Sequence, residues 1–242
     1  MRTIFYYIPS RANGKAPRGL RAGKRWTARS RSFSLLSFSA GMHYYGRMDM
    51  RLETIKVRPD SPEAAYAKAL YEASFPEIER CAFEALQSCC ERGKADLYVY
   101  RSAGKNVGFS IVLLPGHYAY GLFAAIERDQ WNKGHGSQLL QEIRRTYPDR
   151  DFVLDIEPVD EKADNFEERR RRLHFFEKNG FHDTGYEMRD DSGPYRILSN
   201  GSGFDLEGFV ESYDILPDIF PGTLIFQDGS PDPVYDPEKH AL

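Results

Sequence analysis

The stretch of sequence best suited to chemistry is a turn with two glycines, Asp129–Leu140 (Asp-Gln-Trp-Asn-Lys-Gly-His-Gly-Ser-Gln-Leu-Leu). An apolar run, Tyr118–Ile126, precedes it, and an amphipathic run that begins at Leu139 follows it. A strand that passes through such a turn into a helix leaves several backbone N–H groups unpaired, and the helix dipole adds roughly half a positive charge there. Lys133 adds a formal charge. The turn is therefore predicted to hold an anion, and our working hypothesis is the diphosphate of a nucleotide-like cofactor.

The sequence lacks the motifs that several other kinds of catalysis require. The sequence has no Gly-x-Ser-x-Gly nucleophile turn, no His-Glu-x-x-His and no Gly-Lys-Ser/Thr phosphate loop. The six histidines show no metal-ligand spacing, so we predict no metal site. A dinucleotide-binding fingerprint would need a third glycine and a parallel βαβ unit, whereas an antiparallel meander is expected before this turn.

Composition indicates a globular, soluble protein of 242 residues with a net charge of −3. No apolar run approaches the roughly 20 residues of a membrane-spanning helix. Three cysteines, two of them adjacent, do not suggest a disulfide framework, so a reducing cytoplasm is the expected compartment. The small net charge hides an asymmetry, because residues 1–47 contain ten Lys or Arg and no Asp or Glu.

This basic segment sets the expected domain boundaries: an extension over 1–49, a catalytic or binding domain over 50–200, and an extension over 201–242 with a mobile tail from Gln227. Residues 1–49 are expected to be disordered, because they lack apolar content to offset ordering entropy. Three hypotheses for them stay open. They could be a nucleic-acid-binding arm, a targeting segment, or sequence outside the working protein, with translation starting at Met48 or Met50.

Hydrophobic periodicity then predicts an alternation of strands and helices. Ser61 and Pro62 are the cap and first turn of one helix, and Pro76 is the first turn of a second that ends near Arg92 before Gly93. The apolar stripe of that second helix would contain Ile78 and Leu86. The predicted strands are Leu52–Arg58, Asp96–Ser102, Val107–Leu114, Tyr118–Ile126, Phe152–Ile156, Phe181–Met188 and Tyr195–Leu198; further helices are predicted over Ser137–Tyr147, Asn165–Asn179 and Phe204–Tyr213.

This order resembles the GCN5-related N-acetyltransferase (GNAT) superfamily, and two motifs carry the resemblance. Trp131-Asn-Lys-Gly-His-Gly136-Ser is similar to the family's Arg/Gln-x-x-Gly-x-Gly/Ala acyl-CoA loop, and Phe175-Phe-Glu-Lys-Asn-Gly-Phe181 resembles its Tyr-Glu-Lys-x-Gly-Phe segment. The resemblance covers roughly residues 50–200. It implies an α+β fold with a mixed, mostly antiparallel sheet, a splayed parallel strand pair in its middle, and helices on both faces.

The resemblance also implies acetyl-CoA as co-substrate. Its diphosphate would lie on the loop, and its pantetheine arm would add to the edge of Tyr118–Ile126 as a pseudo-strand. The cofactor-binding residues expected on this basis are Ala124, Ala125, Ile126, Trp131, Asn132, Lys133, Gly134, His135, Gly136, Ser137 and Phe176.

Three positions depart from the family pattern. Trp131 stands where the family has Arg or Gln, so one side-chain contact to phosphate is absent. Phe176 stands where a tyrosine often serves as general acid, and Leu122 occupies the mid-strand position where some members keep a carboxylate. The candidate bases are then Glu157 and Glu127, each just past the end of a splayed strand, and His174 is a candidate acid.

The function predicted from these residues is transfer of an acetyl group from acetyl-CoA to an amine by direct attack. The acceptor is either a small cationic amine or a protein amino group. The alternative is a catalytically weak acyl-CoA-binding or sensing module with the same fold, which Phe176 and Leu122 favour. We expect no nucleic-acid or membrane partner, and a monomer or homodimer. The acidic balance of residues 48–242 favours a cationic acceptor through long-range steering.

Overall fold

The computed structural model describes residues 5–6, 51–215 and 222–240. Residues 1–9 and 51–242 form one unit, and residues 10–50, assigned to a separate unit, lie outside the described part. Apart from Phe5–Tyr6, the basic extension predicted over residues 1–49 therefore also lies outside it.

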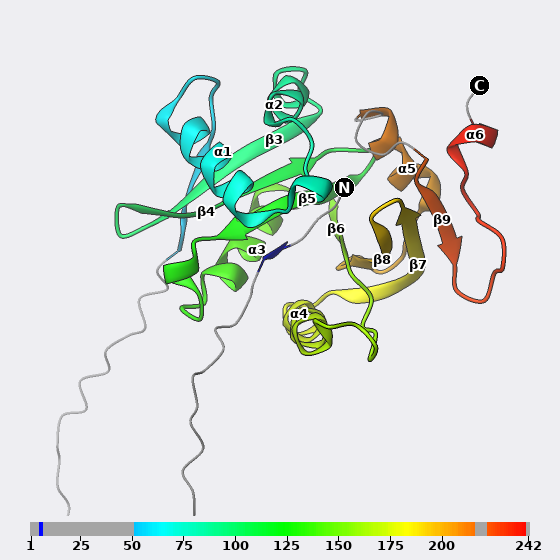
Figure 1. Ribbon diagram of the computed structural model, residues 1–242. Helices are drawn as coiled ribbons and strands as arrows, with labels where there is room; N and C mark the ends of the chain where they lie inside the picture. The colour runs from blue at the N-terminus through cyan, green and yellow to red at the C-terminus, as the bar shows by residue number, and fades with distance from the viewer. Residues whose placement is uncertain (1–4, 7–50, 216–221, 241–242) are drawn as a thin grey trace, which may run out of the picture. The chain divides into compact units, whose positions relative to one another are not determined.

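The described strands form one mixed sheet in the order β2-β3-β4-β5-β6-β8-β7-β9, with β1 paired to β5 (Figure 1). Strand β6 runs parallel to β5, and the other neighbours along this path are antiparallel. The predicted α+β class with a parallel pair in its middle is confirmed. The strands are β1 Phe5–Tyr6, β2 Glu53–Lys56, β3 Ala95–Ser102, β4 Lys105–Leu113, β5 Tyr118–Ile126, β6 Asp151–Ile156, β7 His182–Asp190, β8 Gly193–Ser199 and β9 Leu224–Gln227.

Helices cover both faces of this sheet, as expected. The helices are α1 Pro62–Ser74, α2 Phe83–Glu91, α3 His135–Thr146, α4 Phe166–Lys178, α5 Leu206–Ile215 and α6 Pro237–His240, with single 3₁₀ turns at Glu77–Glu79 and Arg128–Gln130. The Ser61 hydroxyl accepts from the Ala64 N–H at 3.2 Å and caps α1 as predicted. Gly180 follows α4 with φ +82°, a left-handed conformation that ends the helix just after Asn179, where the sequence predicts its end.

Two apolar layers sandwich the sheet and define its faces. On what we call the α1 face, residues of α1, α2 and α5 pack on Tyr118, Tyr120 and Val153. On the α3 face, residues of α3 and α4 pack on Ala119, Ala124 and other strand residues. Any ligand that passes through the sheet would therefore connect a face covered by α3 and α4 with one covered by α1, α2 and α5 (Figure 1).

The second predicted helix begins later than expected. Pro76 is followed by one 3₁₀ turn, Arg80 is extended, and α2 starts only at Phe83. The physical reason is the Tyr71 hydroxyl, which accepts from the Cys81 N–H at 3.0 Å and donates to the Cys81 carbonyl at 3.1 Å. These bonds hold the connection extended, so the predicted stripe through Ile78 is wrong, and Ile78 is 73% exposed.

Two further differences concern the helices next to the site. Helix α3 begins at His135, two residues before the predicted start, so both the second glycine and Ser137 lie in its first turn. The charged run Glu167–Arg172 predicts the exposed face of α4, and this prediction is wrong for Arg172. Its side chain is only 2% exposed because it pairs with Glu157 and Glu168.

The C-terminal segment adds an edge strand, β9, to the sheet. Strand β9 pairs with β7, and Ile225 exchanges backbone hydrogen bonds with Tyr235. Arg196 on β8 bridges Asp183 on β7 and Asp228 just after β9. The tail expected to be mobile from Gln227 is thus tied back to the sheet as far as Tyr235.

Strands β5 and β6 separate after a short parallel ladder. They pair from Tyr118 and Asp151 to Tyr120 and Val153, after which β5 stays with β4 and β6 stays with β8. The register between β4 and β5 shifts at Leu122, the mark of a β-bulge, which increases twist and bends the bulged strand. We call the point beyond Tyr120 and Val153 the strand fork.

Candidate functional site

The predicted anion-binding turn lines a cavity of about 260 Å³ at the start of α3, which we call the loop cavity. The turn and helix α4 provide its walls. The lining residues are Ile126, Gln130, Trp131, Asn132, Gly134, His135, Gly136, Ser137, Phe175 and Lys178. Seven of the residues predicted to bind the cofactor are therefore brought together, while Gln130, Phe175 and Lys178 were not predicted.

The backbone at this point leaves donors available to a ligand. Gly134 is the N-cap of α3 with φ +86°, a left-handed conformation that glycine adopts without strain. The first intrahelical bond of α3 runs from the Gln138 N–H to the Gly134 carbonyl at 3.1 Å, so the amides of residues 135–137 precede the helical ladder. A glycine cap has no side chain to satisfy them. This is the geometry of an anion site at a helix N-terminus.

Gly136 serves a different purpose from Gly134. A Cβ atom built on Gly136 would lie 3.2 Å from the Phe175 ring, closer than ordinary van der Waals contact. The missing side chain lets α4 approach the first turn of α3, and Phe175 thereby forms one wall of the loop cavity.

Charge around the loop cavity favours an anion. Lys178 lines it from α4, and the amino group of Lys133 lies outside the lining, 3.1 Å from the Gln130 side-chain oxygen. The pKa of His135 is lowered, first by burial and then by the charge of Lys133, so its imidazole tends to stay neutral in the ligand-free site.

Trp131 stands where the family pattern places a phosphate-binding side chain, and in the structure its side chain contacts the end of β5. Its indole N–H donates to the Ile126 carbonyl at 2.8 Å. This bond ties the loop to the end of β5, and the Arg128 guanidinium lies 5.8 Å from the ring centroid. Trp131 thus sets the position of the loop relative to the strand.

The strand edge expected to take the pantetheine arm begins beside the loop cavity. Ala124 and Ala125 pair on one edge with Ser110 and Phe109 of β4, and β6 has already left the other edge. In this structure the two residues of β1 lie along that free edge, in parallel register with Ala124 and Ala125 (Figure 1). The edge therefore accepts an extended backbone-like partner.

Glu157, a candidate base, is held by two arginines of α4. Arg169 donates to one carboxylate oxygen at 2.7 Å and Arg172 donates to the other at 2.9 Å. Both oxygens are thus engaged in charge-assisted bonds, which fix α4 to the end of β6.

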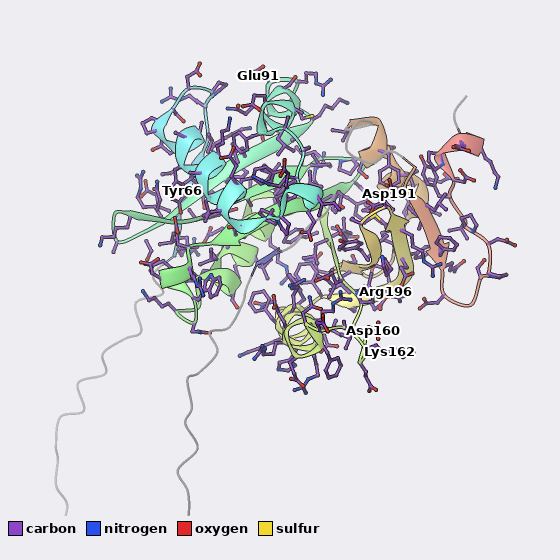
Figure 2. The ribbon with its side chains drawn as sticks, viewed as in Figure 1. Tyr66, Glu91, Asp160, Lys162, Asp191 and Arg196 are labelled. Atoms are coloured by element: carbon purple, nitrogen blue, oxygen red, sulfur yellow. The ribbon has the colours of Figure 1, made fainter. Side chains whose placement is uncertain are left out.

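Glu127, the other candidate base, lies just past β5 and continues its ladder through a bond from its N–H to the Val107 carbonyl at 2.9 Å. Its side chain lies near Tyr66 of α1. The pKa of the Tyr66 hydroxyl is raised first by burial and then by the charge of Glu127. Figure 2 labels Tyr66 on α1, and Asp160 and Lys162 beside α4. Glu127 and Glu157 therefore interact with helices on different faces of the sheet.

His174, the candidate acid, and Phe176, a predicted cofactor-binding residue, both lie on α4 but differ in exposure. The His174 side chain is 78% exposed and lies 3.9 Å from the Glu177 carboxylate, on the outer surface of the helix. Phe176 is fully buried against Phe181, with the ring centroids 5.7 Å apart. Its neighbour Phe175, rather than Phe176, lines the loop cavity.

A buried pair that sequence reasoning missed lies at the strand fork. The Tyr120 hydroxyl donates to the Asp155 carboxylate at 2.6 Å, and both side chains are fully buried. The available signal was an aspartate inside the apolar run Phe152–Ile156. Its partner is 35 residues away, so only the register of β5 and β6 reveals the pair.

Two negative findings hold for the described residues. No group of His, Cys, Asp and Glu side chains in them is arranged to hold a metal ion. No described helix combines the length and the apolar character that a membrane crossing requires.

Comparison with known proteins rests on structure. No family model and no curated protein matches the sequence. A solved structure from Bacteroides thetaiotaomicron, assigned to the GNAT family of acetyltransferases, matches at a TM-score of 0.58 with 20% identity, covering 69% of this chain and 98% of that one. A GNAT acetyltransferase from Elizabethkingia anophelis, solved with acetyl-CoA bound, matches at 0.44 with 12% identity, covering 62% and 97%. The first match carries the assignment: this chain has the GNAT fold.

Proposed function

We propose that the chain is an acetyl-CoA-dependent N-acetyltransferase. The observation that supports this best is the continuity of two sites, a helix N-terminus with unpaired amides and an edge of β5 that starts at the same cavity and that β6 has left. A diphosphate on residues 135–137 would direct the attached arm past Ile126 and along β5. Few ligands other than CoA join a diphosphate to a chain with two amides that can pair with a strand edge.

The pantetheine arm and β1 would use the same edge of β5. A two-residue strand offers few backbone hydrogen bonds, so CoA would displace it at small cost. The arm would run from the α3 face towards the strand fork and bring the thioester to the point where β5 and β6 diverge. An amine would then reach the thioester from the α1 face.

The test has two parts, binding and turnover. Isothermal titration with CoA measures binding, and release of CoA thiol from acetyl-CoA measures turnover with a panel of spermidine, kanamycin and a lysine-containing peptide. We expect saturable binding and thiol release with at least one amine, with the acetylated product confirmed by mass spectrometry. Lack of CoA binding would refute the proposal altogether.

The second candidate is an acyl-CoA-binding module without efficient turnover. It is favoured by the burial of Phe176 where a proton donor is expected, and by the two arginines that engage Glu157. Tight CoA binding together with silence across the amine panel would favour this candidate over the enzyme.

For the acceptor we propose a cationic amine. The acidic linker between the end of β6 and α4 includes exposed Asp160 and Asp164. Such charges raise the local concentration of a cation. Asp160→Asn with Asp164→Asn should raise the KM for a cationic amine and leave the KM for acetyl-CoA unchanged. An unchanged amine KM would contradict the assignment.

A further inference from the structure

The structure contains a buried, hydrogen-bonded pair of polar side chains at the strand fork. Asp155 and Tyr120 are both 0% exposed, and the phenolic oxygen lies 2.6 Å from the carboxylate. Burying a carboxylate costs several kcal/mol unless hydrogen bonds compensate, and a well-packed apolar pair in its place is often neutral or stabilising. A pair kept in spite of that cost is a candidate for a chemical role.

The pair lies where the parallel ladder between β5 and β6 ends. Tyr120 and Val153 form the last rung of the parallel ladder between β5 and β6. Asp155 follows Val153 by two residues, so its side chain points to the same face of the sheet. On its other edge β6 remains paired to β8, where Ile197 lies opposite Asp155. The carboxylate therefore lies at the base of the strand fork.

The pair also lies on the face of the sheet opposite to the loop cavity. Tyr120 and Val153 belong to the apolar layer on the α1 face, and the Phe209 ring of α5 lies 5.1 Å from the Tyr120 ring. The loop cavity lies at the start of α3, on the opposite face. A co-substrate that is held at the loop cavity and threads between β5 and β6 would thus reach the pair with its far end.

We propose that Tyr120 and Asp155 together accept the proton of the acceptor amine. This inference rests on the proposed acetyl transfer and assigns the proton acceptor that the sequence left open. From Ile126 to Tyr120, where the pairing with β6 begins, β5 advances by six residue steps, about 20 Å at the usual rise of a strand. A pantetheine arm laid along that edge from the loop points its sulfur towards Tyr120.

Acetyl transfer makes a carbon–nitrogen bond and breaks a carbon–sulfur bond. The amine nitrogen forms a bond to the thioester carbonyl carbon, the carbon–sulfur bond breaks, and its electron pair leaves on sulfur as a thiolate. The nitrogen's proton passes to the Tyr120 oxygen while the Tyr120 proton moves to the Asp155 carboxylate. Asp155 becomes a carboxylic acid, the thiolate takes a proton from water, and Asp155 later returns its proton to water.

Three variants test the assignment: Asp155→Asn, Tyr120→Phe and the two combined. General base catalysis contributes about 10²- to 10⁴-fold, so each single change should lower kcat by about 10² or more with every panel amine that the unaltered chain acetylates. The Kd for CoA should stay within about twofold, since neither side chain lines the loop cavity. Because the two residues act as one unit, the double variant should be no slower than the slower single variant.

A second Tyr–Asp pair, which is partly buried, provides the control. The Tyr147 hydroxyl donates to the Asp96 carboxylate at 2.6 Å, away from the strand fork, and Asp96 is 8% exposed. Asp96→Asn removes another buried carboxylate, which also pairs with Lys56, and Tyr100→Phe removes a buried hydroxyl that bonds Ser110 at 2.8 Å. Both controls should keep kcat within about threefold of the unaltered chain, whatever their effect on thermal stability.

The outcomes separate the two proposals. Near-normal kcat in Asp155→Asn, multiplicative losses in the double variant, or equal losses in Asp96→Asn would overturn the inference and leave the acetyltransferase intact. CoA binding without transfer by the unaltered chain would overturn both the inference and the enzymatic function. If Asp155→Asn does not fold, Tyr120→Phe, which conserves packing volume, decides the question alone.

Discussion

Substituting alanine for Gly134 tests the anion site with a perturbation whose size follows from the structure. Gly134 has φ +86°, and a Cβ atom there would have nothing within 4 Å. The cost is therefore backbone strain alone, about 1–2 kcal/mol for an L-residue in the left-handed region. To relieve this strain the loop must turn its amides away from the loop cavity. Each amide–phosphate bond lost costs about 1.5–3 kcal/mol, or roughly 10- to 150-fold in the Kd for CoA.

Gly104 supplies the matched control for strain. It lies in the turn between β3 and β4 with φ +76°, and its Cβ would also have nothing within 4 Å. Gly104→Ala and Gly134→Ala should lower the Tm by similar amounts, about 2–4 °C for each kcal/mol. Titration calorimetry should show weaker CoA binding only for Gly134→Ala. Equal CoA affinities in the two variants would refute the assigned role of the loop.

The remaining predictions concern charge and the strand edge. Because a bound diphosphate favours protonated His135, dephospho-CoA should bind more tightly as pH falls from 7.5 to 5.5, and His135→Gln should flatten this trend in calorimetry; unchanged slopes would contradict it. The same lowered pKa means that the ligand-free chain loses stability as pH falls below about 6.5, where the unfolded histidine becomes protonated first. Lys178→Gln should weaken CoA binding about two- to fivefold, and more than Lys133→Gln, because only Lys178 lines the loop cavity. Deleting residues 1–9 removes β1 and should tighten CoA binding, whereas an unchanged Kd would show that β1 and CoA do not compete.

Strand positions were predictable because their signals are local. A continuous apolar run that follows turn residues predicts Tyr118–Ile126 with both ends correct, and Gly180 marks the end of α4. The start of α2 was not predictable in this way. Pro76 is a good first residue for a helix, yet the Tyr71 hydroxyl binds the backbone of Cys81 and keeps that segment extended. That competing contact comes from a side chain on another helix.

The candidate site shows the same difference between features that the local sequence predicts and features that depend on residues distant in the chain. The anion-binding loop is a local feature of sequence, since its glycines, its helix start and its flanking strand are contiguous. Glu157 looked like a free carboxylate at a strand end, but Arg169 and Arg172 reach it from α4. The pair of Tyr120 and Asp155 depends on the parallel register of two strands, which no local pattern specifies.

The central claim is that the first turn of α3 holds the diphosphate of CoA. A crystal structure of the chain with CoA tests it most directly. We predict a diphosphate within hydrogen-bond distance of the amides of residues 135–137, with the pantetheine arm along β5 where β1 now pairs with Ala124 and Ala125. A diphosphate bound elsewhere, or a loop cavity without CoA at saturating concentration, would contradict the claim.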